Sequence, residues 1–371
     1  SGRIEAAAAE LRAVGGNVYA LAADTGGIVR ATGVAREGGR ILLVGDAGVT
    51  VGGALDAAGT TGGAIDVTGS GIAVQNGARI LAGGTSGDGG TVRVGGTLKG
   101  GPGLATADRL LVEDGAVIDV SSVDGRGGTA ILWANEWTRF EGLIRADGGL
   151  GGGFVETSAK GALGIENGRV EVGNGDWLLD PRNVTIGTGG FNPGGPYPNP
   201  FIIAPPDAAG AYTVSRSALQ NALNLGSNVS VTTEQPARTD PGNITVSASV
   251  SWTGSGSLTL RADNNITVSS SISSTGTGSL TLLAGATNPA GSIATTSTLT
   301  MARGAITMTA PGSISIGGTV NLSNTGSLSA TAGSNITVGG AINAAAGSSG
   351  SVLLDAGNAL QMNTGSNLQG S

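Results

Sequence analysis

The feature that most constrains the fold is a repeat of about 22 residues in the second half of the chain. In one column, each apolar residue comes directly after an Asn or Ser. These Asn and Ser residues are Asn243, Asn265, Ser292, Ser313, Asn335 and Asn358. Two more columns repeat in step, at Val250, Ile272, Leu299, Val320 and Ile342, and at Leu258, Leu280, Ile306, Leu328 and Val352. Three short alternating strands per repeat, separated by Gly and Ser turns, predict one turn of a parallel β-helix.

The first half repeats less evenly. Its predicted inward columns are Ile41, Ile65, Val92, Ile131, Val155 and Leu178; Val49, Ile72, Leu110, Trp137 and Leu163; and Leu55, Ile80, Val117, Leu143 and Val170. Gly-Gly pairs precede most members of the first column, and we expect them to form corners with positive φ. The long interval from Val92 to Ile131 predicts an inserted loop near 95–107, and such loops often form the functional face of a solenoid.

These patterns predict an all-β parallel β-helix, or solenoid, of about a dozen three-strand turns. Residues 1–186 form a charged part, with 36 charged residues, and 229–371 form low-charge Ser/Thr/Gly repeats. The Pro/Gly-rich residues 187–228 read as an excursion that either interrupts the coil or bulges from it. Two short flanking helices are predicted, at 5–13 from its Ala and Glu content and at 217–225 from its Leu spacing and flanking Ser and Gly.

Composition excludes several kinds of chemistry. The chain has no Cys and no His, which removes disulfides, thiol nucleophiles, histidine bases and His-ligated zinc, and no cofactor or metal site is predicted. A net charge of −7 without any basic stretch argues against nucleic acid as a partner. No apolar run is long enough for a membrane-spanning helix. The chain starts without Met and ends inside a repeat, so we expect a segment of a longer protein.

The most suggestive polar feature is the column of Asn243, Asn265 and Asn335. Asn side chains that recur at one turn spacing can form an amide ladder. We interpret this column as bracing for a corner of the coil, with ligand binding as the less favoured alternative.

Two further sets of residues could carry function. Trp133, Trp137 and Arg139 are candidate glycan contacts, although the two indoles fall near predicted inward positions, where filling the coil is the favoured interpretation. A carbohydrate-active β-helix would need carboxylates and a base that converge, and Asp119, Arg139 and Glu141 are the candidates beside the inserted loop. The favoured interpretation is instead that these three charged side chains face solvent on the outside of the coil and form no site.

Several stretches of the first half resemble the filamentous-haemagglutinin type of bacterial surface exoprotein. They are 16–22 (GNVYALA), 90–96 (GTVRVGG), 115–121 (GAVIDVS), 128–134 (GTAILWA), 138–142 (TRFEG), 152–160 (GGFVETSAK) and 177–186 (WLLDPRNVTI). The resemblance implies a right-handed β-helix, structural roles for Trp177, Asp180 and Pro181, and secretion through an outer-membrane transporter by a two-partner route. It also implies display in adhesion, aggregation or biofilm formation, and it carries over no catalytic residue.

The leading hypothesis is therefore a non-enzymatic stalk of a secreted or surface-displayed bacterial adhesin. Its expected partners are the transporter of the parent protein and a host or neighbouring-cell surface or glycan. Two alternatives stay open: a carbohydrate-binding or polysaccharide-cleaving β-helix, and a filament subunit that stacks end to end with itself.

Overall fold

The structure, a computed structural model, describes the backbone of residues 3–6, 8–13, 17–20, 28–31 and 369. It describes backbone and side chains of 39–45, 48–188, 213–233, 241–345, 349–363, 365–366 and 368. The chain forms two compact units. The N-terminal unit comprises Ser1–Asp180 with Gly190–Gly210, and the C-terminal unit comprises Pro181–Gly189 with Ala211–Ser371. Each is described by itself.

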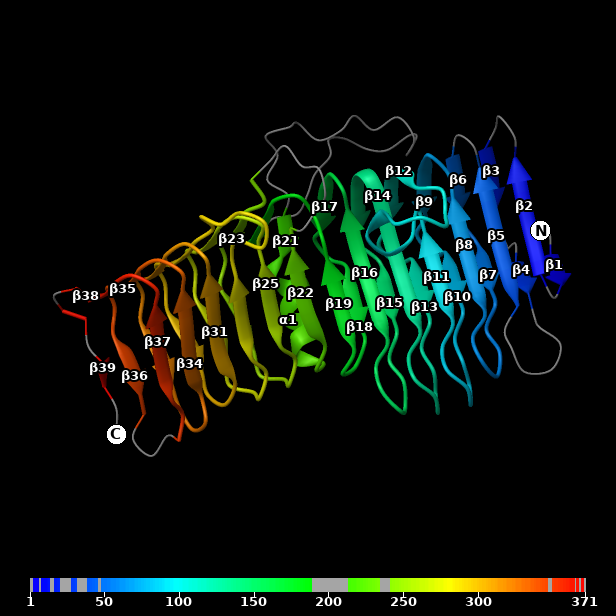
Figure 1. Cartoon of the computed structure of the whole chain (residues 1–371). Coiled ribbons are helices and arrows are strands. Elements are labelled where there is room, and N and C mark those ends of the chain that lie inside the picture. Colours follow the sequence, from blue (N-terminus) through cyan, green and yellow to red (C-terminus); the bar gives the residue numbers. More distant parts are fainter. Residues whose placement is uncertain are drawn as a thin grey trace. The chain divides into compact units, whose positions relative to one another are not determined.

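The described strands of the N-terminal unit stack in three parallel columns, which we call the first, second and third sheets, and the long strand β14 runs through the second and the third and joins them (Figure 1). The first contains β1 (Arg3–Ala6), β4 (Ile28–Ala31), β7 (Ala54–Asp56), β10 (Arg79–Leu81), β13 (Val117–Asp119), β15 (Leu143–Arg145) and β18 (Arg169–Glu171). The second contains β2 (Ala8–Ala13), β5 (Arg40–Gly45), β8 (Ala64–Thr68), β11 (Thr91–Val94), the first part of β14 (Thr129–Phe140), β16 (Phe154–Ala159) and β19 (Asp176–Leu179). The third contains β3 (Asn17–Ala20), β6 (Gly48–Val51), β9 (Gly71–Val74), β12 (Ala107–Val112), the rest of β14 and β17 (Ala162–Ile165).

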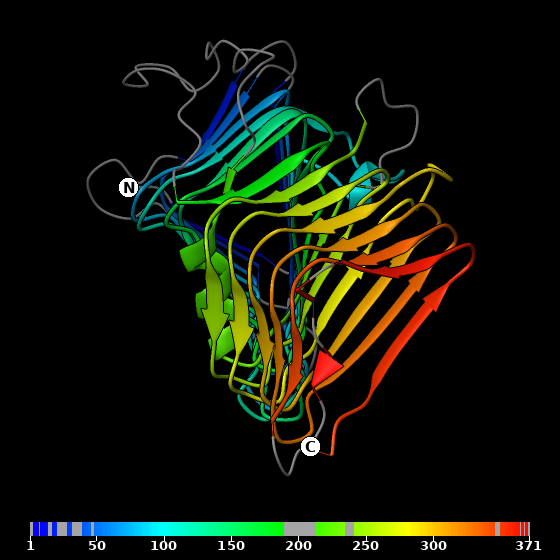
Figure 2. The same cartoon turned by 90° about the vertical axis from the view of Figure 1, so that its left-hand side faces the viewer.

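The C-terminal unit also stacks its strands on three sides of a coil (Figure 2). It opens with β20 (Val184–Gly187), β21 (Thr213–Ser215) and α1 (Arg216–Asn224). One column then contains β23 (Ile244–Val246), β26 (Ile266–Val268), β29 (Ile293–Thr295), β32 (Ile314–Ile316), β35 (Ile336–Val338) and β38 (Leu360–Met362). The second contains β24 (Val250–Trp252), β27 (Ile272–Ser274), β30 (Leu299–Met301), β33 (Val320–Leu322), β36 (Ile342–Ala344) and β39 (Leu368–Gln369). The third contains β22 (Asn228–Thr232), β25 (Leu258–Arg261), β28 (Leu280–Leu283), β31 (Ala305–Ala310), β34 (Ser327–Ala332) and β37 (Val352–Ala356).

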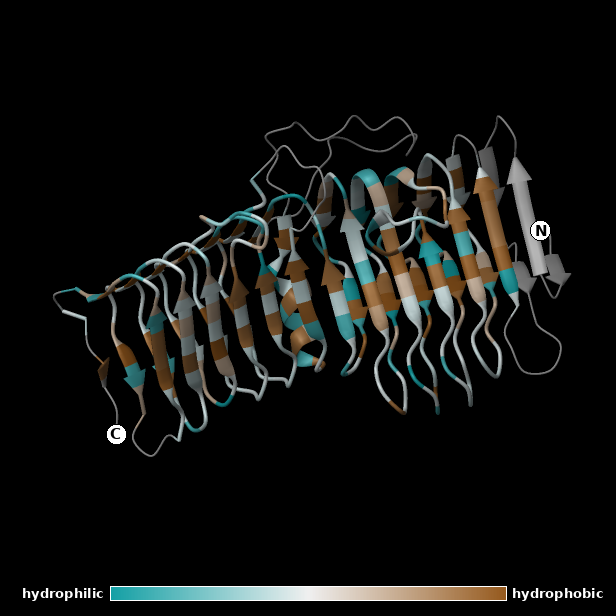
Figure 3. Ribbon diagram, in the orientation of Figure 1, coloured by the Kyte–Doolittle hydropathy of each residue, from teal (hydrophilic) through white to brown (hydrophobic). Residues whose placement is uncertain are grey.

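The predicted fold class, a right-handed parallel β-helix with very little helix, is confirmed. In the C-terminal unit the predicted columns are the observed ones, because Val250 lies opposite Ile272 and Leu258 opposite Leu280, and so on down each stack. The prediction is wrong only in the last turn of the column that follows Asn or Ser. There Leu360, and not the predicted Ala359, lies opposite Ile336. The buried core of each unit is the narrow interior of its coil, and Figure 3 shows apolar residues recurring along its successive strands.

In the N-terminal unit the predicted columns slip by one residue at five places. The inward positions are held by Ala130, Trp177, Thr138, Ile118 and Ile144, and not by their neighbours Ile131, Leu178, Trp137, Val117 and Leu143. Side chains alternate across a strand, so a one-residue slip moves a side chain to the other face. Each slip falls where two successive residues are apolar or bulky, and the alternation pattern is ambiguous there.

One of the two predicted helices is wrong. Residues 3–6 and 8–13 are strands β1 and β2, which pair with β4 and β5. Helix propensity is a weak preference, and stacking on the next turn of the coil overrides it. The second helix is present as α1, and Ser215 caps it by accepting a hydrogen bond from the backbone N–H of Ser217 at 3.2 Å.

The predicted excursion at 187–228 contains 189–212, which lie outside the described residues. On either side of that stretch, Thr185 of β20 lies opposite Thr213 of β21 in a parallel pair. The inserted loop near 95–107 is present between β11 and β12, and it contains one 3₁₀ turn, η1 (Leu98–Gly100).

The Gly-Gly corners serve a purpose other than the predicted one. Gly62, Gly90 and Gly128 do not have positive φ. A Cβ on Gly90 would instead lie 2.0 Å from the carbonyl oxygen of Gly63 on the preceding turn, and one on Gly128 would lie 2.1 Å from that of Gly90. These glycines are required because the backbones of successive turns touch at the corner.

We predict that Gly90→Ala destabilises the N-terminal unit by about 3 kcal/mol, because the backbone of two turns must separate to admit one methyl group. Urea unfolding measures the loss. Gly77→Ala is the matched control: its Cβ meets nothing within 4 Å, and it is strained only by a φ of 81°. We expect the control to cost about 1 kcal/mol, and equal losses for the two variants would contradict the close-approach explanation.

Candidate functional site

An acidic cluster lies under the inserted loop on the outer face of the second sheet. In this sheet Ile131 and Trp133 of β14 lie opposite Glu156 and Ser158 of β16. Outward residues of a coil normally face solvent, but Glu156 is fully buried and Trp133 is only 3% exposed. These two side chains are buried because another segment of the chain lies over them.

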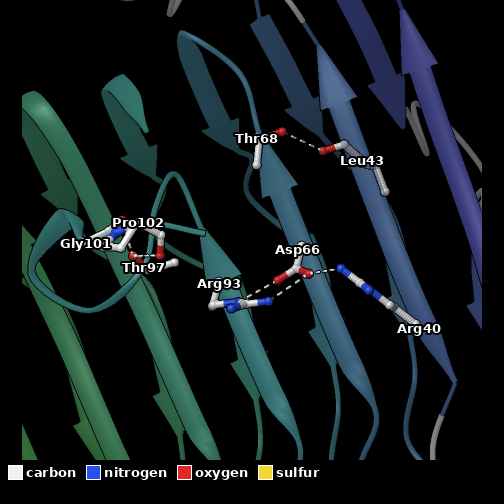
Figure 4. A network of polar contacts seen from close by, with 8 residues as sticks. All are labelled: Arg40, Leu43, Asp66, Thr68, Arg93, Thr97, Gly101 and Pro102. Atoms are coloured by element: carbon white, nitrogen blue, oxygen red, sulfur yellow. Dashed lines mark hydrogen bonds and ion pairs between the residues drawn. The ribbon is translucent and has the colours of Figure 1, made fainter. Parts of the chain in front are cut away.

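Loop residues 95–106 supply that cover. Gly100 lies against the indole of Trp133, since a Cβ at Gly100 would lie 2.3 Å from Cζ2 of the ring. Lys99 and Gly100 both have positive φ, at 52° and 65°. The hydroxyl of Thr97 donates to the carbonyl of Gly101 and closes the loop on itself (Figure 4).

The tip of the loop is attached to two buried carboxylates. The backbone N–H of Lys99 donates to both oxygens of Glu156, at 3.1 and 3.0 Å. The Lys99 ammonium lies 3.9 Å from Oδ2 of Asp180, whose side chain is fully buried. The backbone N–H of Asp180 in turn donates to Ser158 Oγ at 3.0 Å. The loop, β16 and the residue after β19 are thus joined through one polar cluster.

Burial changes the protonation of this cluster. Desolvation raises the pKa of Glu156 to about 7, and the nearby Asp180 carboxylate adds to the rise. Hydrogen bonds from Lys99 and Ser158 and the Lys99 charge act in the opposite direction without cancelling it. Glu156 can therefore take up a proton near neutral pH, but its burial under the loop leaves no opening for a substrate on the described surface.

We predict a pH-dependent stability that Glu156→Gln removes. The folded-state pKa of Glu156 is raised, so its contribution to stability is fully present below about pH 4.5 and is lost as pH rises through about 7. Relative to Glu156→Gln, the wild type should lose about 3 kcal/mol of unfolding free energy between pH 4.5 and 8. Urea unfolding at several pH values measures this, and parallel curves for the two proteins would contradict the assignment.

A second polar network shows how outward charges are used elsewhere on this sheet (Figure 4). Asp66 of β8 is fully buried between arginines of the turns before and after it. Arg93 Nε and Nη2 donate to it at 2.7 and 3.0 Å, and Arg40 Nη2 donates at 3.1 Å. The carboxylate joins three successive turns, and removing one partner of a buried pair is strongly destabilising.

The sequence-predicted site residues do not converge. Asp119 lies on β13 in the first sheet, whereas Arg139 and Glu141 form an ion pair of 3.0 Å at the end of β14 in the third sheet. Trp137 is fully buried and Trp133 is covered by the loop, so neither indole offers a free face for stacking on a sugar. No catalytic arrangement forms from these residues.

The Asn column is present in the C-terminal unit as a series of contacts between turns. Oδ1 of Asn243 accepts from the backbone N–H of Asn265 at 3.1 Å, and Oδ1 of Asn265 accepts from that of Ser292 at 2.9 Å. Further down, Oδ1 of Asn335 accepts from Nδ2 of Asn358 at 3.0 Å. Oδ1 of Asn243 also accepts from Nδ2 of Asn264 at 2.8 Å. The column therefore bonds to both the backbone and the side-chain amides of the next turn, which is the bracing role that the sequence predicts.

The three residues with implied structural roles lie in different settings. Trp177 fills the interior of the coil, and its indole N–H donates to Thr157 Oγ1 at 2.9 Å. Asp180 belongs to the cluster under the loop, and Pro181 is buried at the start of the C-terminal unit. The sequence analysis did not identify Glu156, Lys99 and Asp66 as members of buried polar clusters. The sequence did contain signals for them: Lys99 lies in the inserted loop, Glu156 is a charged residue at an outward position, and Asp66 lies opposite an arginine on the next turn.

Comparison with known proteins gives no relative: no family model matches the chain, and no curated protein matches it. Within the described residues, no group of three or more Asp and Glu side chains is placed to hold a metal ion. No helix among the described residues is long and apolar enough to cross a bilayer.

Proposed function

We propose that this chain is a non-enzymatic stalk segment of a secreted or surface-displayed bacterial adhesin. The observation that carries the proposal is that each unit is a stack of parallel strands in which named polar side chains bond one turn to the next. Asp66 and the Asn243 column are examples from the two units. A stalk supplies distance and presentation, and a fold by itself supports many other functions.

Composition supports the same role. The part from 187 onward carries only nine charged residues, and the outward positions of its strands are chiefly Ser, Thr and Asn. Each turn adds about 4.8 Å in the hydrogen-bonding direction, so repeats of this kind add length in small, equal steps. The stack needs no large side chains and no cofactor to be stiff.

The motifs at 90–96, 115–121, 128–134, 152–160 and 177–186 support the proposed setting, because they resemble filamentous-haemagglutinin-type exoproteins. That resemblance motivates export through an outer-membrane transporter and a role in adhesion, aggregation or biofilm formation. A host or neighbouring-cell surface, or its glycans, is then the proposed partner of the parent protein.

A deletion of one turn tests the stalk proposal. Removing residues 314–335 joins Ser313 to Ile336, which occupies the position that Ile314 held in the column. We expect the variant to fold with similar stability and with a maximum dimension, measured by small-angle X-ray scattering, shorter by about 5 Å. Removing 314–324 instead, half a turn, is the control and should disrupt the stack. Loss of folding in the full-turn variant would contradict a modular stalk.

The proposed location has its own test. Antibodies raised against this chain should label intact cells of the producing bacterium or detect the protein in the medium, and surface protease should remove the cell-bound signal. Labelling that requires permeabilised cells would contradict surface display.

A further inference from the structure

A groove on the first sheet of the N-terminal unit has the chemistry of a ligand site. Its volume is about 560 Å³. Its floor consists of the outward residues of β7, β10 and β13, and its wall consists of the corners that follow these strands. The polar side chains of the lining are Asp56, Arg79, Thr85, Asp119 and Ser121.

The wall of the groove is rigid because its corners are hydrogen-bonded turn to turn. Gly59 donates its backbone N–H to Gly83 at 3.1 Å, and Gly84 donates to Ser121 at 2.9 Å. Thr85 donates its backbone N–H back to Gly59 at 3.1 Å. A ligand would meet a preformed surface, and little ordering cost would oppose binding.

The central cation of the groove is available to a ligand. Arg79 is exposed and makes no side-chain hydrogen bond or ion pair with any residue that the structure describes. Asp119 uses Oδ1 to accept from the backbone N–H and the hydroxyl of Ser121, at 2.9 and 2.6 Å. Its Oδ2 accepts no hydrogen bond from the described part of the chain, so it can accept from a ligand.

The next turns of the same sheet make an informative contrast. Arg145 of β15 and Arg169 of β18 both pair with Glu171, at 3.1 and 2.9 Å. Both guanidinium groups therefore have a carboxylate partner within the sheet, although one glutamate serves two arginines. Arg79, on the turns that form the groove, has no such carboxylate partner among the described residues, so its guanidinium can donate to a ligand without breaking an ion pair.

We propose that this groove binds a neutral hexose oligosaccharide, with one sugar residue opposite each of three successive turns. The turn spacing of about 4.8 Å is close to the length of one hexopyranose residue. Carboxylates accept from sugar hydroxyls and a guanidinium donates to sugar oxygens. Asp56 and Asp119 disfavour anionic polymers, and Arg79 disfavours cationic ones.

A peptide fits this surface less well. Strand β10 is paired with β7 on one side and β13 on the other, so the floor offers no free edge for an added strand. Among the described residues that line the groove, Leu81 is the one large apolar side chain, and anchor pockets for peptide side chains need more.

Titration of the whole chain with defined oligosaccharides tests the proposal. Calorimetry or NMR would use di-, tri-, tetra- and hexasaccharides of glucose, mannose and galactose. At least one series should bind, with affinity that rises to the trisaccharide and then levels off. Arg79→Ala should weaken binding about tenfold or more, since it removes a charged hydrogen bond.

Matched variants keep the test decisive. Asp119→Asn retains the oxygen that accepts from Ser121 and removes the charge, so it should fold and also weaken binding. Arg169→Ala, on the same sheet, should leave binding unchanged. Absence of binding to every series, equal binding by Arg79→Ala and wild type, or preference for a hexuronate oligomer or a basic peptide would each overturn the proposal. None of these outcomes depends on the stalk assignment.

Discussion

Parallel backbone pairing between successive turns is the constraint on which the rest of each unit depends. Once Ile244 pairs with Ile266, and Ile266 with Ile293, each residue is fixed opposite its equivalent one turn away. The interior is then narrow and must be filled by stacked Ile, Val, Leu and Ala. The corners must let two backbones touch, which is why a Cβ has no room at Gly90.

The same register determines what polar residues can do. An outward side chain always has a neighbour at the same level on the next turn, so charges and amides pair along the stack. Asp66 does this with Arg93, and Asn265 does it with Ser292. Glu156 is different because the loop covers it, and burial raises its pKa to about 7. The polar groups that stay available, such as Arg79, are therefore the ones to consider for ligand binding.

The fold was predictable because a period of about 22 residues admits few architectures. Apart from Ala359, the C-terminal columns were assigned correctly, since a single Ile, Val or Leu marks most inward positions between polar neighbours. The N-terminal columns slipped at pairs such as Ala130 and Ile131, where two apolar residues adjoin and only the tertiary pairing decides which one faces inward. The strand at 8–13 was missed for a related reason, because local propensity does not report stacking on a distant turn.

The candidate sites were less predictable than the fold. The sequence indicated the loop near 95–107, but not that Lys99 reaches Glu156, 57 residues away. Asp119 was a candidate, yet its groove neighbours come from turns at Asp56 and Arg79. Which side chains become neighbours depends on the register between successive turns. An error of one residue in that register changes which side chains lie on the same face.

Because the chain contains no Cys, engineered pairs test turn-to-turn register directly. Thr267 and Ala294 are direct partners on adjacent turns, and Ser315 is the partner of Ala294 on the turn beyond. Adjacent partners lie about 5 Å apart at Cα, within disulfide range, and residues two turns apart do not. The account predicts that Thr267→Cys with Ala294→Cys oxidises to a disulfide in the folded protein, and that Thr267→Cys with Ser315→Cys does not. Efficient crosslinking of the second pair, or none of the first, would contradict the stacked coil.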